Sequence, residues 1–347
     1  MVAVFRQSDM DRFAAAASTK HERSDRVVCN RQRGNESGNI STSRVDRDTN
    51  MQQPATMSAS ELTDDARTAH AWQRLKAARG FVFDMDGVLY RGNQPLGGVA
   101  DALNALTIRD RRYMLATNNS MSTPASYVTK LHAMGIDVPK ESILTAGLAT
   151  RDYLVETLAP GSGIYVIGMP ALREQLFDGT PFHPVQYGEE DPAAVVVGLD
   201  LAFDYEKLKN ANQAIRNGAR FIATNTDATL PTEVGLVPGA GSIVAAVTVA
   251  SGQEPTVIGK PETPLLVQSL HHIGVDAADA VMVGDRLDTD IVAGHRAGML
   301  TVLVLTGVST RDDLPQAPVL PDLVLTDLTA FVDAIVADPP PTSRENS

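Results

Sequence analysis

Short apolar runs alternate along the chain with segments whose apolar residues recur at helical spacing. Runs such as AVVVGL at 194–199 and TVLVL at 301–305 are apolar at nearly every position, which is typical of strands buried on both faces. The segment DYEKLKNANQAIRNG at 204–218 instead has apolar residues every three or four positions, which predicts a helix. The alternation indicates an α/β protein whose parallel sheets are covered by helices on both faces.

The predicted elements share these two patterns and run from residue 63 to the C-terminal part of the chain. The predicted strands are 81–86, 113–119, 164–168, 194–199, 220–224, 281–285 and 301–305. The predicted helices are 63–80, 99–112, 124–135, 143–158, 204–218 and 290–298. Glycine stop signals end several of these helices, as at Gly80 and Gly135.

The two ends of the chain have a different composition. Residues 1–70 are rich in Ser, Arg, Asp, Asn and Gln and show no sustained apolar period, so we predict a disordered N-terminal extension. The simplest explanation is a tail or an over-long reading frame with Met51 or Met57 as the true start, and a targeting or partner-binding arm is the alternative. Its frequent acidic residues make it a poor organelle transit peptide. The tail at 337–347 is also predicted to be disordered.

Charge and cysteine content narrow the class of protein. The net charge is −12, which argues against broad contact with nucleic acid or anionic lipid, although a local metal ion can still attract a small anion. The single cysteine, Cys29, allows neither an intramolecular disulfide nor a cysteine zinc site. No run of 18 apolar residues is present, so we expect no transmembrane helix. Together these features favour a cytoplasmic protein.

Four polar clusters follow predicted strands, where the sites of open parallel sheets form. They are Asp84-Met85-Asp86-Gly87, Thr117-Asn118-Asn119-Ser120, Gly259-Lys260-Pro261 and the segment GDRLDTD at 284–290. Each has an ordinary structural explanation when it is taken alone. The first is compatible with an acidic turn, the second and fourth with helix capping, and the third with a surface lysine.

The same clusters suit phosphate chemistry when they are taken together. Two neighbouring carboxylates, Asp84 and Asp86, repel each other unless a cation or a shared proton relieves the repulsion. Hydroxyl and amide groups after Thr117 can donate hydrogen bonds to phosphoryl oxygens. Lys260 precedes a proline that restricts its backbone and could place an ammonium over a phosphate. The three acids of GDRLDTD suit a hard cation with oxygen ligands.

In this order the clusters resemble the four motifs of the haloacid dehalogenase (HAD) superfamily of phosphatases, as DMDGVLY, TNNS, GKP and GDRLDTDI. The segments YRGNQPLGG, TNTD and VIGKPETP are similar to the NagD-like subfamily, which includes 4-nitrophenyl-phosphate and phosphoglycolate phosphatases. The resemblance covers roughly residues 75–335. It implies a Rossmann-like core at 71–160 and 256–336 and a C2-type α/β cap inserted at 161–255.

The resemblance also implies the chemistry of the site. Asp84 is expected to attack phosphorus and form an aspartyl-phosphate, while Asp86 protonates the leaving group and then deprotonates water. Mg²⁺ is expected to bind the carboxylates of Asp84 and Asp285 and the backbone carbonyl of Asp86. Dehalogenases of the superfamily lack the second carboxylate, so Asp86 favours phosphoryl transfer over carbon–halogen cleavage.

The remaining roles concern the phosphate. Thr117, Asn118, Asn119 and Lys260 are expected to bind its oxygens, and Asp290 to orient Lys260 from behind. The sequence does not decide how the roles are distributed between Asp288 and Asp290. Relatives in the family often dimerise through the cap, so a homodimer is a further expectation, and the expected partner is a small-molecule phosphate ester.

One departure from the family bears on the substrate. Some relatives that act on aromatic phosphates carry a cap histidine after the TNTD-like segment, but here no histidine lies between Asp227 and His271. Phosphoglycolate, glycerol phosphate, sugar or nucleotide phosphates, or a broad substrate range, are therefore favoured over a vitamin-B6-type ester. The alternatives are a phosphomutase or phosphotransferase, a phospho-accepting regulatory domain, and a non-catalytic metal- or sugar-binding protein.

Overall fold

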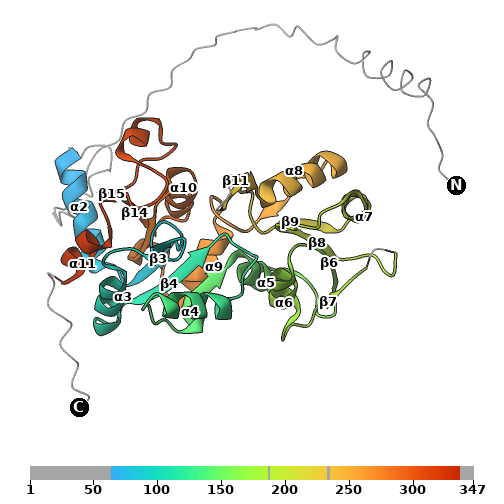
Figure 1. Cartoon of the computed structure of the whole chain (residues 1–347), viewed down its shortest axis with the longest axis horizontal. Coiled ribbons are helices and arrows are strands. Elements are labelled where there is room, and N and C mark those ends of the chain that lie inside the picture. The colour runs from blue at the N-terminus through green and yellow to red at the C-terminus, as the bar shows by residue number, and fades with distance from the viewer. Residues whose placement is uncertain (1–63, 187, 233–234, 337–347) are drawn as a thin grey trace, which may run out of the picture. The chain divides into compact units, whose positions relative to one another are not determined.

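The computed structural model describes residues 64–186, 188–232 and 235–336 (Figure 1). The predicted disorder at 1–63 and 337–347 lies outside the described residues. Helix α2 (Asp64–Ala77) lies within the helix expected at 63–80 and overlaps the end of the predicted extension, so residues 64–70 are helical rather than disordered. The helix is anchored by Ala71 and Leu75, which are buried in the core and supply the apolar face that the polar residues before them lack.

A six-stranded sheet, which we call the core sheet, carries the site. Its order is β15-β14-β13-β1-β4-β5, and every neighbouring pair is parallel, which confirms the predicted fold class. The strands are β1 (Gly80–Phe83), β4 (Arg112–Thr117), β5 (Ile143–Thr145), β13 (Ala280–Gly284), β14 (Leu300–Val304) and β15 (Leu323–Leu325).

The register brings three strand ends together. Phe83, the last residue of β1, lies opposite Val283 on one side and Leu115 on the other. The residues that follow β1, β4 and β13 therefore leave the sheet at the same edge. This edge is where polar side chains can gather without entering the apolar layers.

Helices cover both faces of the core sheet, as its nearly continuous apolar strands require. Within β1, Phe81 and Phe83 join one apolar cluster, where they meet Phe331 edge-on, while Val82 joins the cluster on the other face. The helices are α2, α3 (Val99–Ile108), α4 (Pro124–Ala133), α5 (Ala146–Thr157), α9 (Pro264–Ile273), α10 (Val292–Arg296) and α11 (Leu328–Val336).

A second parallel sheet, the cap sheet, is inserted between α5 and α9 and belongs to the same compact unit as the core. Its order is β12-β9-β8-β6-β7. The strands are β6 (Gly163–Ile167), β7 (His183–Pro184), β8 (Ala194–Val197), β9 (Arg220–Ala223) and β12 (Thr256–Val257). The inserted helices are α6 (Pro170–Phe177), α7 (Tyr205–Arg216) and α8 (Ala240–Ser251). Because β12 pairs with β9, the cap sheet extends two residues beyond the predicted boundary at 255.

Some predicted elements differ from the structure. The helix expected at 143–158 is a strand, β5, followed by α5, and Thr145 separates the two because its hydroxyl accepts a hydrogen bond from the N–H of Leu148 as an N-cap. The strand expected at 81–86 ends at Phe83. The helix expected from residue 290 begins earlier, as a π-helical turn, η4 (Leu287–Ile291), that continues into α10.

Other elements carried no sequence signal strong enough to predict. They include strands β7, β12 and β15, helices α6, α8, α9 and α11, and two short hairpins, β2 (Tyr90–Arg91) with β3 (Gln94–Pro95) and β10 (Thr229–Thr232) with β11 (Gly235–Pro238). Short 3₁₀ segments occur at η2 (Lys140–Ser142), η3 (Ala277–Asp279) and η5 (Arg311–Gln316). In the part of the chain that the structure describes, no helix is long and apolar enough to cross a membrane.

Candidate active site

The turn after β1 places two aspartates at the polar edge of the core sheet. Asp84 follows the strand directly, and the chain reverses through Gly87, whose N–H donates to the carbonyl of Tyr90. Gly87 has a φ of +87°, and a Cβ there would lie 2.5 Å from the Asp285 carboxylate. Only glycine satisfies both the backbone and this close approach.

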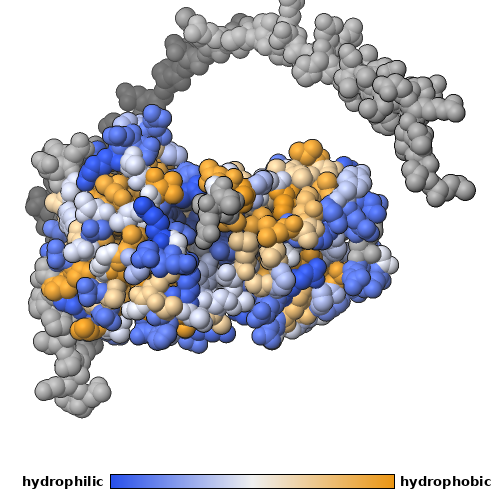
Figure 2. Space-filling view, in the orientation of Figure 1, coloured by the Kyte–Doolittle hydropathy of each residue, from blue (hydrophilic) through white to orange (hydrophobic). Residues whose placement is uncertain are grey.

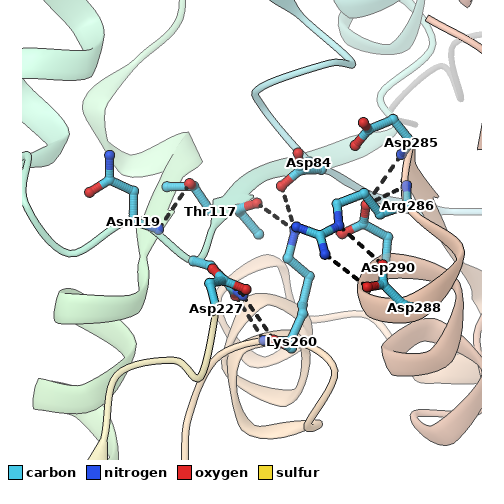
Figure 3. A network of polar contacts seen from close by, with 11 residues as sticks. Asp84, Thr117, Asn119, Asp227, Lys260, Asp285, Arg286, Asp288 and Asp290 are labelled. Atoms are coloured by element: carbon cyan, nitrogen blue, oxygen red, sulfur yellow. Dashed lines mark hydrogen bonds and ion pairs between the residues drawn. The ribbon is translucent and has the colours of Figure 1, made fainter. Parts of the chain in front are cut away.

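Lys260 reaches this edge from the loop after the cap sheet's last strand. Its side chain is 2% exposed, and its ammonium lies 2.5 Å from Asp84 Oδ1 and 2.8 Å from Asp290 Oδ1 (Figure 3). Burial by itself lowers the pKa of Lys260, but the attraction of Asp290 and Asp84 outweighs it and holds that pKa above its ordinary value. The lysine is therefore a permanent positive charge beside Asp84.

Asp288 and Asp290, which the sequence did not separate, have different partners. Asp290 Oδ2 accepts the backbone N–H groups of Asp285 at 3.2 Å and Arg286 at 3.1 Å, while its other oxygen faces Lys260. Asp288 pairs with the guanidinium of Arg286 at 2.8 Å, with 61% of its side chain exposed. The structure thus places Asp290 behind Lys260, in the orientation expected of it.

Asp285 has one carboxylate oxygen in use and one without a partner. Oδ2 accepts the N–H of Val308 at 2.7 Å, whereas Oδ1 is buried and has no hydrogen-bond partner among the described residues. Oxygen atoms of Asp84, Asp285 and Asp290 all lie within 4.8 Å of one another. Burial raises the pKa of Asp84 to about 7 and of Asp285 to about 8, with the nearby carboxylates adding to the effect.

These residues fit a hard divalent cation. Three carboxylates, of which Asp285 and Asp290 are buried and Asp84 is partly exposed, face a single ammonium, so an added positive charge would relieve their repulsion. Asp290 Oδ2 accepts backbone N–H groups, and Asp290 Oδ1, which has no hydrogen-bond partner in the described part of the chain, is ion-paired with Lys260 at 2.8 Å, whereas Asp285 Oδ1 has neither kind of partner there. Asp84 and Asp285 are therefore the residues that fit a cation, while Asp290 is engaged by Lys260.

Asp86 is open to the cavity rather than enclosed like Asp84. Its side chain is exposed, and the partial burial around it raises its pKa, while the charges of Lys130 and Arg91 act in the opposite direction. A carboxyl group with a raised pKa holds a proton more readily near neutral pH. This is the property that a general acid requires.

Thr117, Asn118 and Asn119 follow β4, but the side chain of Asn118 is already occupied. Its amide donates to the carbonyl of Lys260 at 2.8 Å and accepts the N–H of Lys260 at 2.8 Å. The same amide lies 3.3 Å from Asp227. The side chain therefore holds the backbone of Lys260 in place, and the contact with phosphate expected of Asn118 is left to its backbone. Asn119 Oδ1 similarly accepts the N–H of Met121.

The loop after β14 supports the site without any sequence motif that marked it. Thr306 Oγ1 donates to the carbonyl of Gly87 at 2.6 Å, and the N–H of Val308 binds Asp285. Arg91 in turn donates to the carbonyls of Thr306 and Gly307. Sequence reasoning missed this loop because backbone donors can be supplied by any residue type.

A cavity of about 480 Å³ lies over these groups, and the cap supplies part of its wall. Leu199, Leu230 and Ala240 give that wall apolar patches, and Figure 2 shows apolar surface around α8 and β11. Asp227 and Asn225 add polar groups, with Asn225 donating to the carbonyl of Asn118 at 2.8 Å. Their segment, TNTD, had been noted only for its likeness to the family.

Comparison with known proteins identifies this arrangement. The profile of the haloacid dehalogenase-like hydrolases matches residues 81–178, and a HAD-hydrolase-like profile matches residues 257–331. An acid sugar phosphatase of Staphylococcus aureus (strain USA300) is 39% identical over 258 residues, which are 74% of this chain and 98% of that protein. The chain belongs to the haloacid dehalogenase-like hydrolase family.

Solved structures of HAD phosphatases agree with this assignment. NagD from E. coli K-12 has a TM-score of 0.68 and 31% identity, covering 73% of this chain and 97% of that one. Glycerol phosphate phosphatase from Mycobacterium tuberculosis, in complex with magnesium, has a TM-score of 0.68 and 36% identity, covering 74% of this chain and 77% of that one. The predictions of a NagD-like HAD protein and of a phosphatase are confirmed.

Proposed function

We propose that this HAD phosphatase hydrolyses small phosphate monoesters with Mg²⁺, through an aspartyl-phosphate on Asp84. The arrangement of Asp84 carries the proposal: it lies 2.5 Å from the buried ammonium of Lys260, at the floor of a cavity that Asp86 also faces. A nucleophile, a fixed positive charge and a separate proton carrier are thereby combined at one sheet edge.

The first half of the reaction breaks the ester. Asp84 attacks phosphorus, the bond from phosphorus to the leaving oxygen breaks, and Asp86 donates its proton to that oxygen. Lys260 offsets the negative charge of the phosphoryl oxygens, and Thr117 at the end of β4 is positioned to contact them. A divalent cation held by Asp84, Asp285 and the backbone carbonyl of Asp86 would supply the charge neutralisation that an anionic nucleophile requires.

The second half regenerates the enzyme. Asp86, now ionised, removes a proton from a water molecule that attacks the phosphoryl group, and Asp84 is released as the carboxylate. The partial exposure of Asp86 suits this role, because the same side chain must exchange its proton twice. The cap side chains over the cavity restrict the access of other water molecules.

The cavity supports a small substrate. Its volume of about 480 Å³ must hold the phosphate as well as the leaving group, and its cap wall combines leucines with Asp227 and Asn225. Relatives named for sugar phosphates and glycerol phosphate are consistent with this size. We propose phosphoglycolate, glycerol phosphate, or sugar or nucleotide phosphates, with 4-nitrophenyl phosphate as a substrate in vitro.

Phosphate release with Mg²⁺ tests the mechanism. Asp84→Asn should abolish turnover, whereas Asp101→Asn, at an exposed position of α3, should retain it. Equal activity of wild type and Asp84→Asn would refute the nucleophile. Transfer of phosphate to a second substrate without release would favour a phosphotransferase, and a stable phosphoprotein that does not turn over would favour a regulatory domain.

Two further expectations remain proposals. The single cysteine and the absence of a membrane-spanning helix among the described residues are compatible with the cytoplasmic location that we propose. We also propose a homodimer formed through the cap, as the family resemblance implies. Light scattering at several protein concentrations would test it.

A further inference from the structure

The catalytic cavity is lined by four cations, and three of them already have partners within the protein. Lys260 is paired with Asp84 and Asp290, and Arg286 with Asp288. Arg91 donates to the backbone carbonyls of Thr306 and Gly307. The charges of these three groups are therefore engaged before a substrate binds.

Lys130 is the fourth cation, and its situation differs. It makes no ion pair with a carboxylate of the described residues, and its ammonium lies 3.8 Å from the centre of the Tyr90 ring. The side chain is half-buried, and burial lowers the pKa of Lys130 although the charge of Asp86 attracts the ammonium from beyond ion-pair distance. An aromatic face holds such a cation in place but does not neutralise it.

The position of Lys130 relates it to the leaving group. Its helix, α4, also carries Tyr127, which is buried and lines the cavity together with Thr117 and Asn119. Lys130 lies one helical turn further along and is the charge that acts most strongly on Asp86. Since Asp86 must face the leaving oxygen to protonate it, the atoms beyond that oxygen pass close to Lys130.

We infer that Lys130 forms a subsite for a second anionic group, so that the enzyme prefers phosphate esters whose leaving group carries a carboxylate or another phosphate. The inference rests on the proposed function and narrows its substrate class. A carboxylate or phosphate at this place would form an ion pair with Lys130, the only cation of the cavity that has no hydrogen-bonding or ion-pairing acceptor among the described residues. Ser126, one turn before Lys130 and also in the cavity wall, adds a hydroxyl beside it.

A matched pair of substrates distinguishes binding of an anionic leaving group by Lys130 from a contribution of Lys130 to the hydrolysis of every substrate. Phosphoglycolate and glycerol 1-phosphate are both small, but only the first carries an additional negative charge on its leaving group. The readout is the ratio of kcat/KM for phosphoglycolate to that for glycerol 1-phosphate. For Lys130→Met we expect this ratio to fall by about ten- to hundredfold, which is the usual size of a charge-assisted contact. The loss should appear mainly in KM.

Three further variants complete the experiment. Lys130→Arg keeps the charge and should retain most of the preference, and Lys130→Gln serves if the methionine variant fails to fold. Lys209→Met removes an exposed lysine of the cap helix α7 and should leave the ratio unchanged. A sugar bisphosphate compared with its monophosphate would show whether a second phosphate substitutes for the carboxylate.

Two outcomes would overturn the inference. If Lys130→Met lowered kcat/KM equally for both substrates and shifted the pH profile, Lys130 would act through Asp86 and not on the substrate. A wild type that hydrolyses glycerol 1-phosphate but shows no preference for anionic leaving groups would also contradict it. Neither result would disturb the proposed function, which fails only if the wild type releases no phosphate or if Asp84→Asn remains active.

Discussion

The carboxylate of Asp285 depends on a neighbour that has no side chain. An ideal Cβ at Gly307 would lie 1.8 Å from Asp285 Oδ2, far inside van der Waals contact. We expect Gly307→Ala to displace this carboxylate and to lower kcat about tenfold or more, since a displacement that costs about 1.4 kcal/mol in the transition state has that effect. Steady-state phosphate release over a range of Mg²⁺ concentrations measures it, and the apparent affinity for Mg²⁺ should weaken as well.

Gly97 offers the matched control for this substitution. A Cβ there meets no atom within 4 Å, and the residue is exposed. Gly97→Ala should therefore retain the activity of the wild type. If Gly307→Ala proved as active as Gly97→Ala, the Asp285 carboxylate would not need its observed position.

At the scale of the element, the π-helical turn η4 sends two aspartates in different directions. Asp290 is buried against Lys260, and Asp288 is exposed beside Arg286. We expect Asp290→Asn to lower kcat about tenfold or more, because it removes a charge-assisted contact that orients the phosphate-binding lysine. Asp288→Asn should change kcat by less than about threefold, since an exposed ion pair contributes little.

The two variants control each other, because they make the same chemical change two residues apart in one turn. Thermal unfolding of both proteins would show whether a loss of activity reflects a loss of the fold. Similar kcat values for the two variants would contradict the division of roles in this turn.

For the whole molecule, the buried carboxylates link metal binding to stability and pH. An aspartate in the unfolded chain has a pKa near 3.8, but burial raises the pKa of Asp84 to about 7 and of Asp285 to about 8 in the metal-free fold. The folded state therefore binds more protons than the unfolded state between about pH 4 and pH 8, and metal-free stability falls as the pH rises through this window. Mg²⁺ should raise the melting temperature more at pH 8 than at pH 5, because protons compete with it at the lower pH.

Thermal unfolding after treatment with EDTA, with and without Mg²⁺, tests this dependence. Asp285→Asn should remove most of the Mg²⁺-dependent rise in melting temperature and should also flatten the metal-free pH dependence. Equal stabilisation by Mg²⁺ at pH 5 and pH 8 would show that these carboxylates do not bind the cation.

The sequence by itself determined the fold class and the residues at the polar edge of the core sheet. Nearly continuous apolar strands require cover on both faces, and Asp84, Thr117 and Asp285 each follow such a strand directly or end it. These signals are local, so they can be recognised without knowing which strands are neighbours. The same local reasoning failed at β5, where two apolar residues and Thr145 run directly into a helix.

Only the tertiary structure decided which groups contact one another. Lys260 pairs with Asp290 rather than with Asp288, and the side chain of Asn118 forms hydrogen bonds with the backbone of Lys260. Both contacts join segments that are far apart in the chain. Likewise, only the folded structure shows that Lys130 lies over the Tyr90 ring and makes no ion pair with a carboxylate of the described residues. Such contacts depend on distances across the fold, and a local pattern of residue types does not contain them.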